Sequence, residues 1–418
     1  FRIAFSRLFH ISTKISRGTQ YFNGCNEILQ DYLNRGIIRK YPDKCPHFLP
    51  HHTVVGKRLR IVFDASSHER DSRSLNDTLF AGPNLQDLAG KLIQFRATIY
   101  PVWADIEKAF LMISLKESDR EFSKFLRTRD PNSPLSGNNL VIYRFRRITF
   151  GIVSCPFLLA ATLQHHLETT PGTLAKEIQQ HSLLYVDNLL LLAECPEEAR
   201  EKAIEAQKIF SSAKMRLRDF VAADSRILSV VPSEDHLSET EPLVLGQKWI
   251  LSSDTLFFSF PIVPSPEKLT RRIILKTIAS FFDPLGLCSP CLVGAKLFFQ
   301  SMWEKSRGWD EPIPDKEQIP WQELRNDWHG QTITIPRHTF RTKNSTLQLH
   351  VFSDASPNAF ARATDGNFSS SLVYSISSKP RKMGKDQPDG LTIPRLDLLG
   401  VLLGVRAAKF VKTHFSYE

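Results

Sequence analysis

The chain of 418 residues lacks the features of several protein classes. No apolar run reaches the ~18 residues that cross a membrane, and no signal peptide opens the sequence. The cysteines have no spacing typical of a secreted disulfide framework. They are Cys25, Cys45, Cys155, Cys195, Cys288 and Cys291. These absences predict a protein of a reducing, intracellular compartment, cytoplasmic or nuclear, with no membrane partner.

Zinc-binding patterns and long repeats are lacking as well. Cys288 and Cys291 form a C-x-x-C pair, but neither a second pair nor a histidine follows at a zinc-like distance. No internal repeat of solenoid length is present. The sequence also lacks an initial methionine and begins at Phe1 in the middle of a pattern, so we expect a piece of a longer polyprotein.

The composition is that of a globular protein with a basic charge balance. Hydrophobic residues make up 42% and charged residues 23%, and the length suggests about two or three domains. Lys and Arg number 54 against 44 Asp and Glu, which gives a net charge of +10 and favours a polyanionic partner. The basic residues cluster at Lys57, Arg58 and Arg60; Arg144, Arg146 and Arg147; Lys214, Arg216 and Arg218; and Arg271 and Arg272.

The most informative motif is Tyr185-Val186-Asp187-Asn188. Its first two residues end the apolar run 183–186, and the apolar run 189–192 follows it. Two strands that flank an acidic tip would form a hairpin that presents a carboxylate at the surface of a sheet. Taken alone, such a turn between buried strands is more often structural than catalytic.

Three further segments occur upstream in a definite order. Residues 59–66 read as a strand with Arg60 near its start, and residues 99–103 form an extended apolar segment that leads to Asp105. Between the two acidic sites, Phe150 and Gly151 form a turn that opens a helix. The sequence therefore places two carboxylates at separate strand signals, with a glycine turn between them.

In this order and spacing, the segments resemble the reverse transcriptase of BEL/Pao-type LTR retrotransposons, followed by the start of the RNase H region of the same Pol polyprotein. The resemblance implies an α/β fold, α+β in the palm, with right-hand polymerase fingers, palm and thumb and then a partial RNase H-like domain. The expected domains are residues 1–225 for fingers and palm, 226–310 for a thumb-like helical region, 311–345 for a connector and 346–418 for the partial RNase H-like domain.

The implied activity is RNA-directed DNA synthesis by two-metal nucleotidyl transfer, with Mg²⁺ or Mn²⁺ as the cofactor. The implied partners are an RNA template, a DNA primer and deoxynucleoside triphosphates; no oligomeric state is implied. By the resemblance, Asp105 and Asp187 match the metal ligands of the family. The match suits magnesium, which requires oxygen ligands, here converging from separate strand ends. Asn188 stands where the family has a third catalytic carboxylate.

Other residues acquire roles through the same resemblance. Arg60 matches an arginine that contacts the incoming triphosphate, Phe110 matches a ring beneath the sugar, and Phe150 and Gly151 border the nucleotide. Core packing is the alternative for the two phenylalanines. Residues 217–220 read Leu-Arg-Asp-Phe where the family has a basic-aromatic run, so the acid at position 219 weakens the expected primer contacts.

The resemblance also predicts where this copy is impaired. Asn188 removes one negative charge beside the metals, which can cost ~10²–10³ in rate. In the RNase H-like region Asp354 matches the first acid, whereas Asp397 stands where the family has Glu, and we expect no RNA cleavage. The alternative function is a catalytically dead remnant that at most binds nucleic acid. A third alternative is an unrelated basic scaffold, in which Asp105 and Asp187 would not converge.

Local patterns predict most of the secondary structure. Helices are expected around residues 85–95, 156–167 and 196–213, within 267–304, and from Ile393. Strands are expected at residues 140–145, 244–249, 347–352 and 371–377. Ser118 and Glu121 are expected to form a capping box, residues 232–242 an exposed loop, and residues 309–320 a connector rich in proline and acid.

Overall fold

A computed structural model of the chain describes residues 1–15, 19–41, 47–55, 59–83, 87–130, 132–261, 268–304, 307–339, 348–355, 360–365, 371–378 and 393–415. The fold is mixed α/β and divides into two compact units. The first comprises residues 1–86, 106–179 and 206–217, and the second comprises residues 87–105, 180–205 and 218–418. These two units are each made of separated stretches of the chain, whereas the four expected domains are consecutive ranges. The expected ranges stay a prediction.

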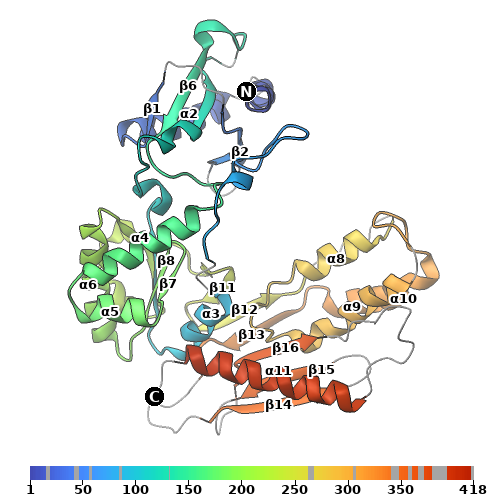
Figure 1. Ribbon diagram of the computed structural model, residues 1–418. Coiled ribbons are helices and arrows are strands. Elements are labelled where there is room, and N and C mark those ends of the chain that lie inside the picture. The colour runs from blue at the N-terminus through green and yellow to red at the C-terminus, as the bar shows by residue number, and fades with distance from the viewer. Residues whose placement is uncertain are drawn as a thin grey trace. The chain divides into compact units, whose positions relative to one another are not determined.

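The first unit is built around a small antiparallel sheet in the order β1-β6-β5 and a hairpin of β2 and β3 (Figure 1). The strands are β1 (Ile38–Lys40), β2 (His51–Val55), β3 (Leu59–Phe63), β5 (Lys124–Thr128) and β6 (Leu140–Phe145). The helices are α1 (Arg2–Ile15), α2 (Thr19–Asn34), α4 (Cys155–Thr169) and α5 (Thr173–Gln180). Strand β6 has the predicted bounds, because its short run of apolar, β-branched and aromatic residues is a local signal.

Aromatic side chains form the core of this unit. Phe63 of β3 packs edge-on against Phe125 of β5 and Phe145 of β6, with ring centroids 5.0 and 4.9 Å away. The buried ring of His51 stacks on Phe63, and burial lowers the pKa of His51 to about 3. His51 is therefore neutral at physiological pH and belongs to the core.

The second unit contains a four-stranded sheet in the order β7-β8-β4-β9. Its strands are β4 (Val102–Ile106), β7 (Leu184–Tyr185), β8 (Asn188–Leu191) and β9 (Leu217–Val221). Helix α3 (Leu88–Ala97) precedes β4 and starts at Asp87, whose carboxylate accepts the backbone N–H groups of Ala89 and Gly90. Helix α6 (Pro196–Ser212) follows β8 and extends into the first unit from residue 206. Its expected apolar face is buried at Ala199, Ala203, Ala206 and Phe210, whereas the fifth expected member, Ala213, follows the helix and is half-buried.

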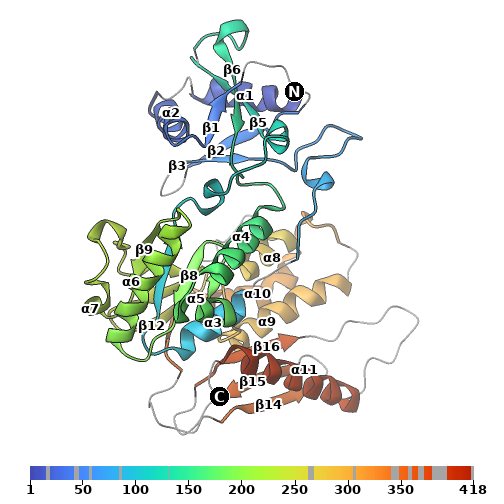
Figure 2. The same cartoon turned by 60° about the vertical axis from the view of Figure 1, so that its left-hand side comes forward.

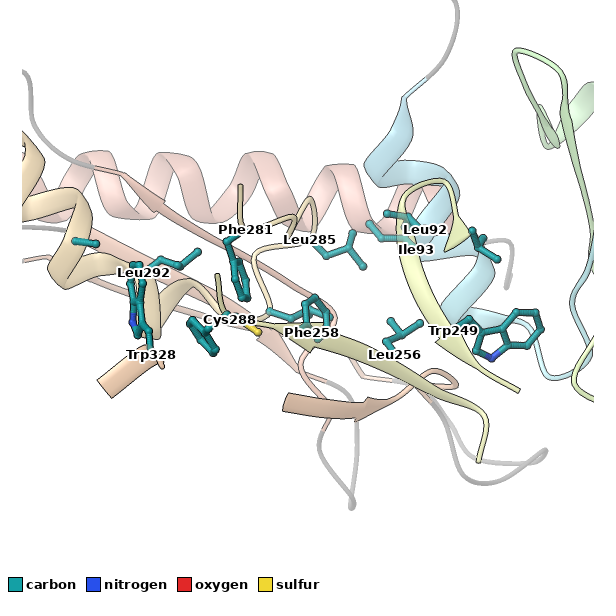
Figure 3. Packing of buried hydrophobic residues seen from close by; sticks show 14 of the residues in the cluster. Leu92, Ile93, Trp249, Leu256, Phe258, Phe281, Leu285, Cys288, Leu292 and Trp328 are labelled. Atoms are coloured by element: carbon teal, nitrogen blue, oxygen red, sulfur yellow. The ribbon is translucent and has the colours of Figure 1, made fainter. Parts of the chain in front are cut away.

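A second antiparallel sheet of this unit has the order β10-β11-β12-β13. It comprises β10 (Leu243–Val244), β11 (Gln247–Ile250), β12 (Thr255–Ser259) and β13 (Thr332–Pro336), and α7 (Ser225–Leu228) precedes it. Helices α8 (Arg271–Ala279), α9 (Ser289–Ser301) and α10 (Asp315–Trp328) lie between β12 and β13. Figure 3 shows the main core, where Leu92 and Ile93 of α3 lie in one buried cluster with Trp249, Leu256 and Phe258.

The C-terminal part of this unit is a three-stranded antiparallel sheet with one long helix along it (Figure 1). The sheet has the order β14 (His350–Ala355), β15 (Phe360–Asp365) and β16 (Tyr374–Ser378), and the helix is α11 (Ile393–His414). Gly90 of α3 lies so close to His414 that a Cβ at Gly90 would be 2.3 Å from the imidazole ring. Helix α11 therefore packs directly on α3, the helix that precedes the Asp105 strand.

Two local expectations are wrong, and a third is largely confirmed. Ser118 does not cap a helix, because its own backbone is helical and Glu121 instead pairs with Lys124 and Arg144. The expected connector at residues 309–320 contains the first part of α10 and is therefore partly helical, with Pro320 inside the helix. A third expectation, the exposed loop at residues 232–242, is largely confirmed, because most of its residues are exposed and only Asp235 and Pro242 are buried.

The described cysteines are not paired with one another. Cys25, Cys155, Cys195, Cys288 and Cys291 are all free thiols. The Cys288 backbone N–H donates to Asp283 at 2.7 Å at the start of α9, and burial raises the pKa of the Cys288 thiol to about 12. In the described ranges, no helix combines the length and the apolar character that a membrane span needs.

Candidate functional site

The acidic tip is a hairpin with a tight turn between β7 and β8. Tyr185 and Asn188 are paired across the hairpin, and Val186 in the turn has a φ of 54°. A β-branched residue rarely adopts this left-handed conformation, which costs of order 1–3 kcal/mol. Leu189, Leu190 and Leu191 are completely buried and anchor the strand that follows. Buried leucines thus hold a strained turn that presents Asp187.

Strand β4 brings the second acid to the same place. It pairs antiparallel with β8, and Asp105 lies directly opposite Asn188. Asp105 is the one residue of β4 that is not buried, since Val102, Trp103, Ala104 and Ile106 are all in the core. The sheet therefore places Asp105, Asp187 and Asn188 together, although the two acids are 82 positions apart in the sequence. Their roles stay a prediction.

The two carboxylates are electrostatically coupled. Burial, and then the charge of Asp187, raises the pKa of Asp105 to about 6. Burial also raises the pKa of Asp187, although hydrogen bonds to its carboxylate oppose this. One of these bonds comes from Asn188, whose Nδ2 donates to Asp187 Oδ1 at 3.1 Å. The amide of Asn188 therefore binds the neighbouring acid, which a carboxylate at this position could not do.

A guanidinium approaches the acids from β9, the neighbour of β4 in the sheet. Arg218 Nε lies 3.4 Å from Asp105 Oδ2 and 3.7 Å from Asp219 Oδ2. Asp219 has a φ of 50°, and its charge also raises the pKa of Asp105. Sequence reasoning placed Arg218 in a basic cluster but missed this ion pair, because residues 113 positions apart share no local signal.

The donor set suits a divalent cation in its charge. Two partly buried carboxylates whose pKa values are raised would be stabilised by a cation, and a guanidinium already lies beside one of them. Within the described residues, no group of three or more Asp, Glu, His or Cys side chains converges in a metal-binding arrangement. Two carboxylates and the Asn188 side-chain oxygen are thus the ligands that this part of the sheet offers.

The raised pKa of Asp105 predicts a pH-dependent effect of Asp105→Asn. A folded-state pKa above the unfolded value gives stability that is present at low pH and is lost as the pH rises through about 6. In buffer with EDTA at pH 7.5, Asp105→Asn should raise the free energy of unfolding by roughly 1–3 kcal/mol. The gain should vanish near pH 4. Urea unfolding at both pH values measures this, and an equal gain at both would contradict it.

The expected nucleotide-binding residues lie in the first unit. Phe110 is buried, and its ring is 5.0 Å from the exposed ring of Phe150 in an edge-on arrangement. Gly151 has a φ of 90°, and a Cβ there would lie 2.0 Å from the Phe63 carbonyl oxygen, so the close approach requires glycine. Arg60 is exposed on β3, three residues before Phe63. Gly151 thus lies against the end of β3, and Phe150, its neighbour in the chain, contacts Phe110.

The basic clusters differ in their surroundings. Arg144 is buried, lies 4.4 Å from the Tyr41 ring centroid and pairs with Glu117 and Glu121, so its charge is already paired within the fold. Arg146 is exposed. Arg147 donates to the Leu111 and Met112 carbonyls, Arg271 is buried, and Arg272 pairs with Asp310. Lys57 and Arg58 lie outside the described residues.

The two expected RNase H-like acids lie on separate elements. Asp354 belongs to β14, opposite Ala361 of β15, and its side chain lies outside the described part of the chain. Asp397 is exposed in the first turns of α11. The contacts of α11 with β14 and β15 place the helix over the strand that carries Asp354. Their roles also stay a prediction.

Comparisons with known proteins give two findings. Residues 270–418 match the Pao retrotransposon-like RNaseH-like domain family. The chain is similar in fold to the foamy viral protease-reverse transcriptase dRH solved in complex with double-stranded DNA, with a TM-score of 0.59 and 13% identity. The alignment covers 94% of this chain and 61% of that one. A search of curated proteins gives no match.

Together the two findings support a region of a retroelement Pol protein with an RNase H-like domain. The family match begins at Thr270, well before the expected start of that domain at residue 346, and therefore includes α8, α9, α10 and β13. The chain spans about three fifths of the length of the viral protein that it resembles in fold.

Proposed function

We propose that this chain is the reverse transcriptase region of a BEL/Pao-type Pol polyprotein, followed by the start of its RNase H region. The observation that carries the proposal is the pairing of β4 with β8, which sets Asp105 opposite Asn188 and next to Asp187. The fold similarity to a viral reverse transcriptase and the RNaseH-like family match support it. In this proposal the β7-β8-β4-β9 sheet is the palm, the β1-β6-β5 sheet belongs to the fingers, and α8 and α9 are thumb-like.

The proposed cofactor is Mg²⁺ or Mn²⁺, held by Asp105 and Asp187. When bound, the metal would neutralise phosphate charge and lower the pKa of a primer hydroxyl. The protein's own contribution is to keep two carboxylates at adjacent strand positions in a partly buried setting, where their charges act strongly on a cation. The substrates in this proposal are deoxynucleoside triphosphates, an RNA template and a DNA primer.

The second candidate is a remnant that binds nucleic acid without extending it. Two contacts favour it: Asn188 donates to Asp187, and Arg218 occupies one side of Asp105. Primer extension on an RNA template with Mg²⁺ and then Mn²⁺ separates the candidates. Weak extension that Asp187→Asn abolishes supports a polymerase, whereas extension that is absent from a folded chain under both metals supports the remnant.

Binding of a primer-template duplex should depend on salt and on Arg146. A basic protein that contacts phosphates releases counterions, so affinity should fall steeply between about 50 and 200 mM salt. Arg146→Ala should weaken binding of all duplex sequences alike, because backbone contacts carry no base information. Fluorescence anisotropy at several salt concentrations measures both effects.

Arg144→Ala is the matched comparison for this binding experiment. It removes a buried cation that pairs with Glu117 and Glu121, so its main effect should be a lower melting temperature. Affinity that is insensitive to salt, or that is unchanged by Arg146→Ala, would contradict the proposed duplex contact.

A further inference from the structure

The first unit contains an open groove of about 460 Å³ that is lined by residues of α2, β5 and β6. Figure 2 shows these three elements in the first unit, and β5 is the edge strand of its sheet. The lining of the groove includes Asn26 and Gln30 from α2, Arg127 and Arg129 from β5 and the residue after it, and Tyr143 from β6. One acidic residue, the exposed Glu27, also lines it.

Arg127 is a buried cation without an acidic partner. It is 3% exposed, its Nη2 donates to Asn26 Oδ1 at 2.9 Å, and its guanidinium lies 4.8 Å from the Phe22 ring centroid. Its buried Nε has no hydrogen-bond partner, and no described acidic side chain forms an ion pair with it. A buried charge is costly unless it is paired, so an anion in the groove would supply what Arg127 lacks.

Two neighbours extend this site toward solvent. Arg129 lies two positions after Arg127, on the same face, is exposed and forms no ion pair with a described residue. Tyr143 is half-buried, and its ring stacks on Phe125 at a centroid distance of 5.6 Å, which fixes its orientation. Both guanidinium charges act to lower the pKa of Tyr143, against the larger effect of burial, so positive charge from both residues reaches the Tyr143 hydroxyl.

We infer that this groove binds a segment of single-stranded nucleic acid, with a phosphate at Arg127 and Arg129 and a base against Tyr143. Guanidinium groups bind phosphate oxygens in pairs, and aromatic rings with neighbouring arginines are the usual platform for unpaired bases. Asn26 and Gln30 also line the groove, and the groups of their side-chain amides not used by Arg127 and Asn34 would serve a base edge. An acidic peptide would use the arginines but not these other groups. The inference rests on the proposed nucleic-acid function and adds to it a site away from the carboxylates.

The test is binding of a fluorescein-labelled ten-nucleotide dT strand to the full chain, measured by anisotropy. Arg129→Ala should weaken binding about 5–10-fold, and Tyr143→Leu should weaken it about tenfold. Arg127→Lys keeps the positive charge but loses the planar guanidinium that can donate two parallel hydrogen bonds to a phosphate, so it should also weaken binding. Arg39→Ala is the control. In the register of β1 with β6, the backbone of Arg39 lies opposite that of Arg144 and the backbone of Lys40 lies opposite that of Tyr143, so the Arg39 side chain is on the other face of the sheet from Tyr143. Arg39→Ala should change the affinity by less than about twofold.

Each outcome decides the inference. Weakening by Arg129→Ala and Tyr143→Leu, with an unchanged melting temperature, supports it. Equal affinities for these variants and Arg39→Ala would overturn the groove assignment while leaving nucleic-acid binding intact. Displacement of the strand by polyglutamate as effectively as by unlabelled dT would show a general anion site and would also overturn it. If the unmodified chain binds no single strand, this inference fails, and duplex binding then decides separately whether the proposed function stands.

Discussion

Asn188→Asp should raise the rate of primer extension about 10²-fold, more than any other single substitution in this chain. The substitution restores a negative charge beside Asp187 and removes the amide that now donates to Asp187 Oδ1. A metal near the primer hydroxyl would be held by three carboxylates in place of two. Because this interaction strengthens in the transition state, kcat should rise while KM changes by less than about twofold. Steady-state extension on an RNA template with Mg²⁺ measures both constants.

A readout besides activity comes from stability. Without metal, a third charge next to two carboxylates whose pKa values are already raised should make Asn188→Asp less stable than the unmodified chain. Added Mg²⁺ should raise the melting temperature of Asn188→Asp more than that of the unmodified chain, since binding to the folded state alone stabilises it.

Three control variants make the activity result interpretable. Asn188→Ala should not restore extension, and Asp187→Asn combined with Asn188→Asp should abolish it. Robust extension by the unmodified chain would contradict the impairment. If Asn188→Asp folds and binds duplex but still fails to extend it, the defect lies elsewhere, and Asp219→Asn in the same background tests the acid beside Arg218.

Arg337→Met should lower the free energy of unfolding by about 3–5 kcal/mol. Arg337 is completely buried after β13, and its Nε and Nη2 donate to the two oxygens of Asp254 at 2.6 and 2.8 Å. It also donates to the carbonyl of Phe95 in α3 and to the carbonyls of Thr98 and Ile99, which lie between α3 and β4. Methionine fills similar space but leaves Asp254 and three carbonyl groups without this donor.

Tryptophan fluorescence during urea unfolding measures this loss, because Trp249 lies in the same core and its Nε1 also donates to Asp254. Arg272→Met is the matched control. Arg272 makes a similar two-bond contact with Asp310, but both side chains are exposed, so the unfolding transition should hardly move. Equal shifts for the two variants would show that burial of the Arg337 pair has no special effect.

The sequence alone determined the elements whose signals are local. The run Leu140–Phe145 is a strand with the predicted ends, and α6 begins at Pro196, because a short apolar run and an N-terminal proline act within a few residues. The apolar residues around Asp187 likewise predicted the hairpin, and the order of the motifs led to the retroelement resemblance. These signals need no knowledge of what packs against them.

Only the tertiary structure decided the environment of the charged residues. Arg144 and Arg146 are two positions apart, yet Arg144 is buried against Glu117, Glu121 and Tyr41, whereas Arg146 is exposed. The contact of Arg218 with Asp105 likewise joins residues 113 positions apart. Burial and ion pairing depend on groups that the fold brings from distant parts of the chain, and a local pattern of charges carries no record of those partners.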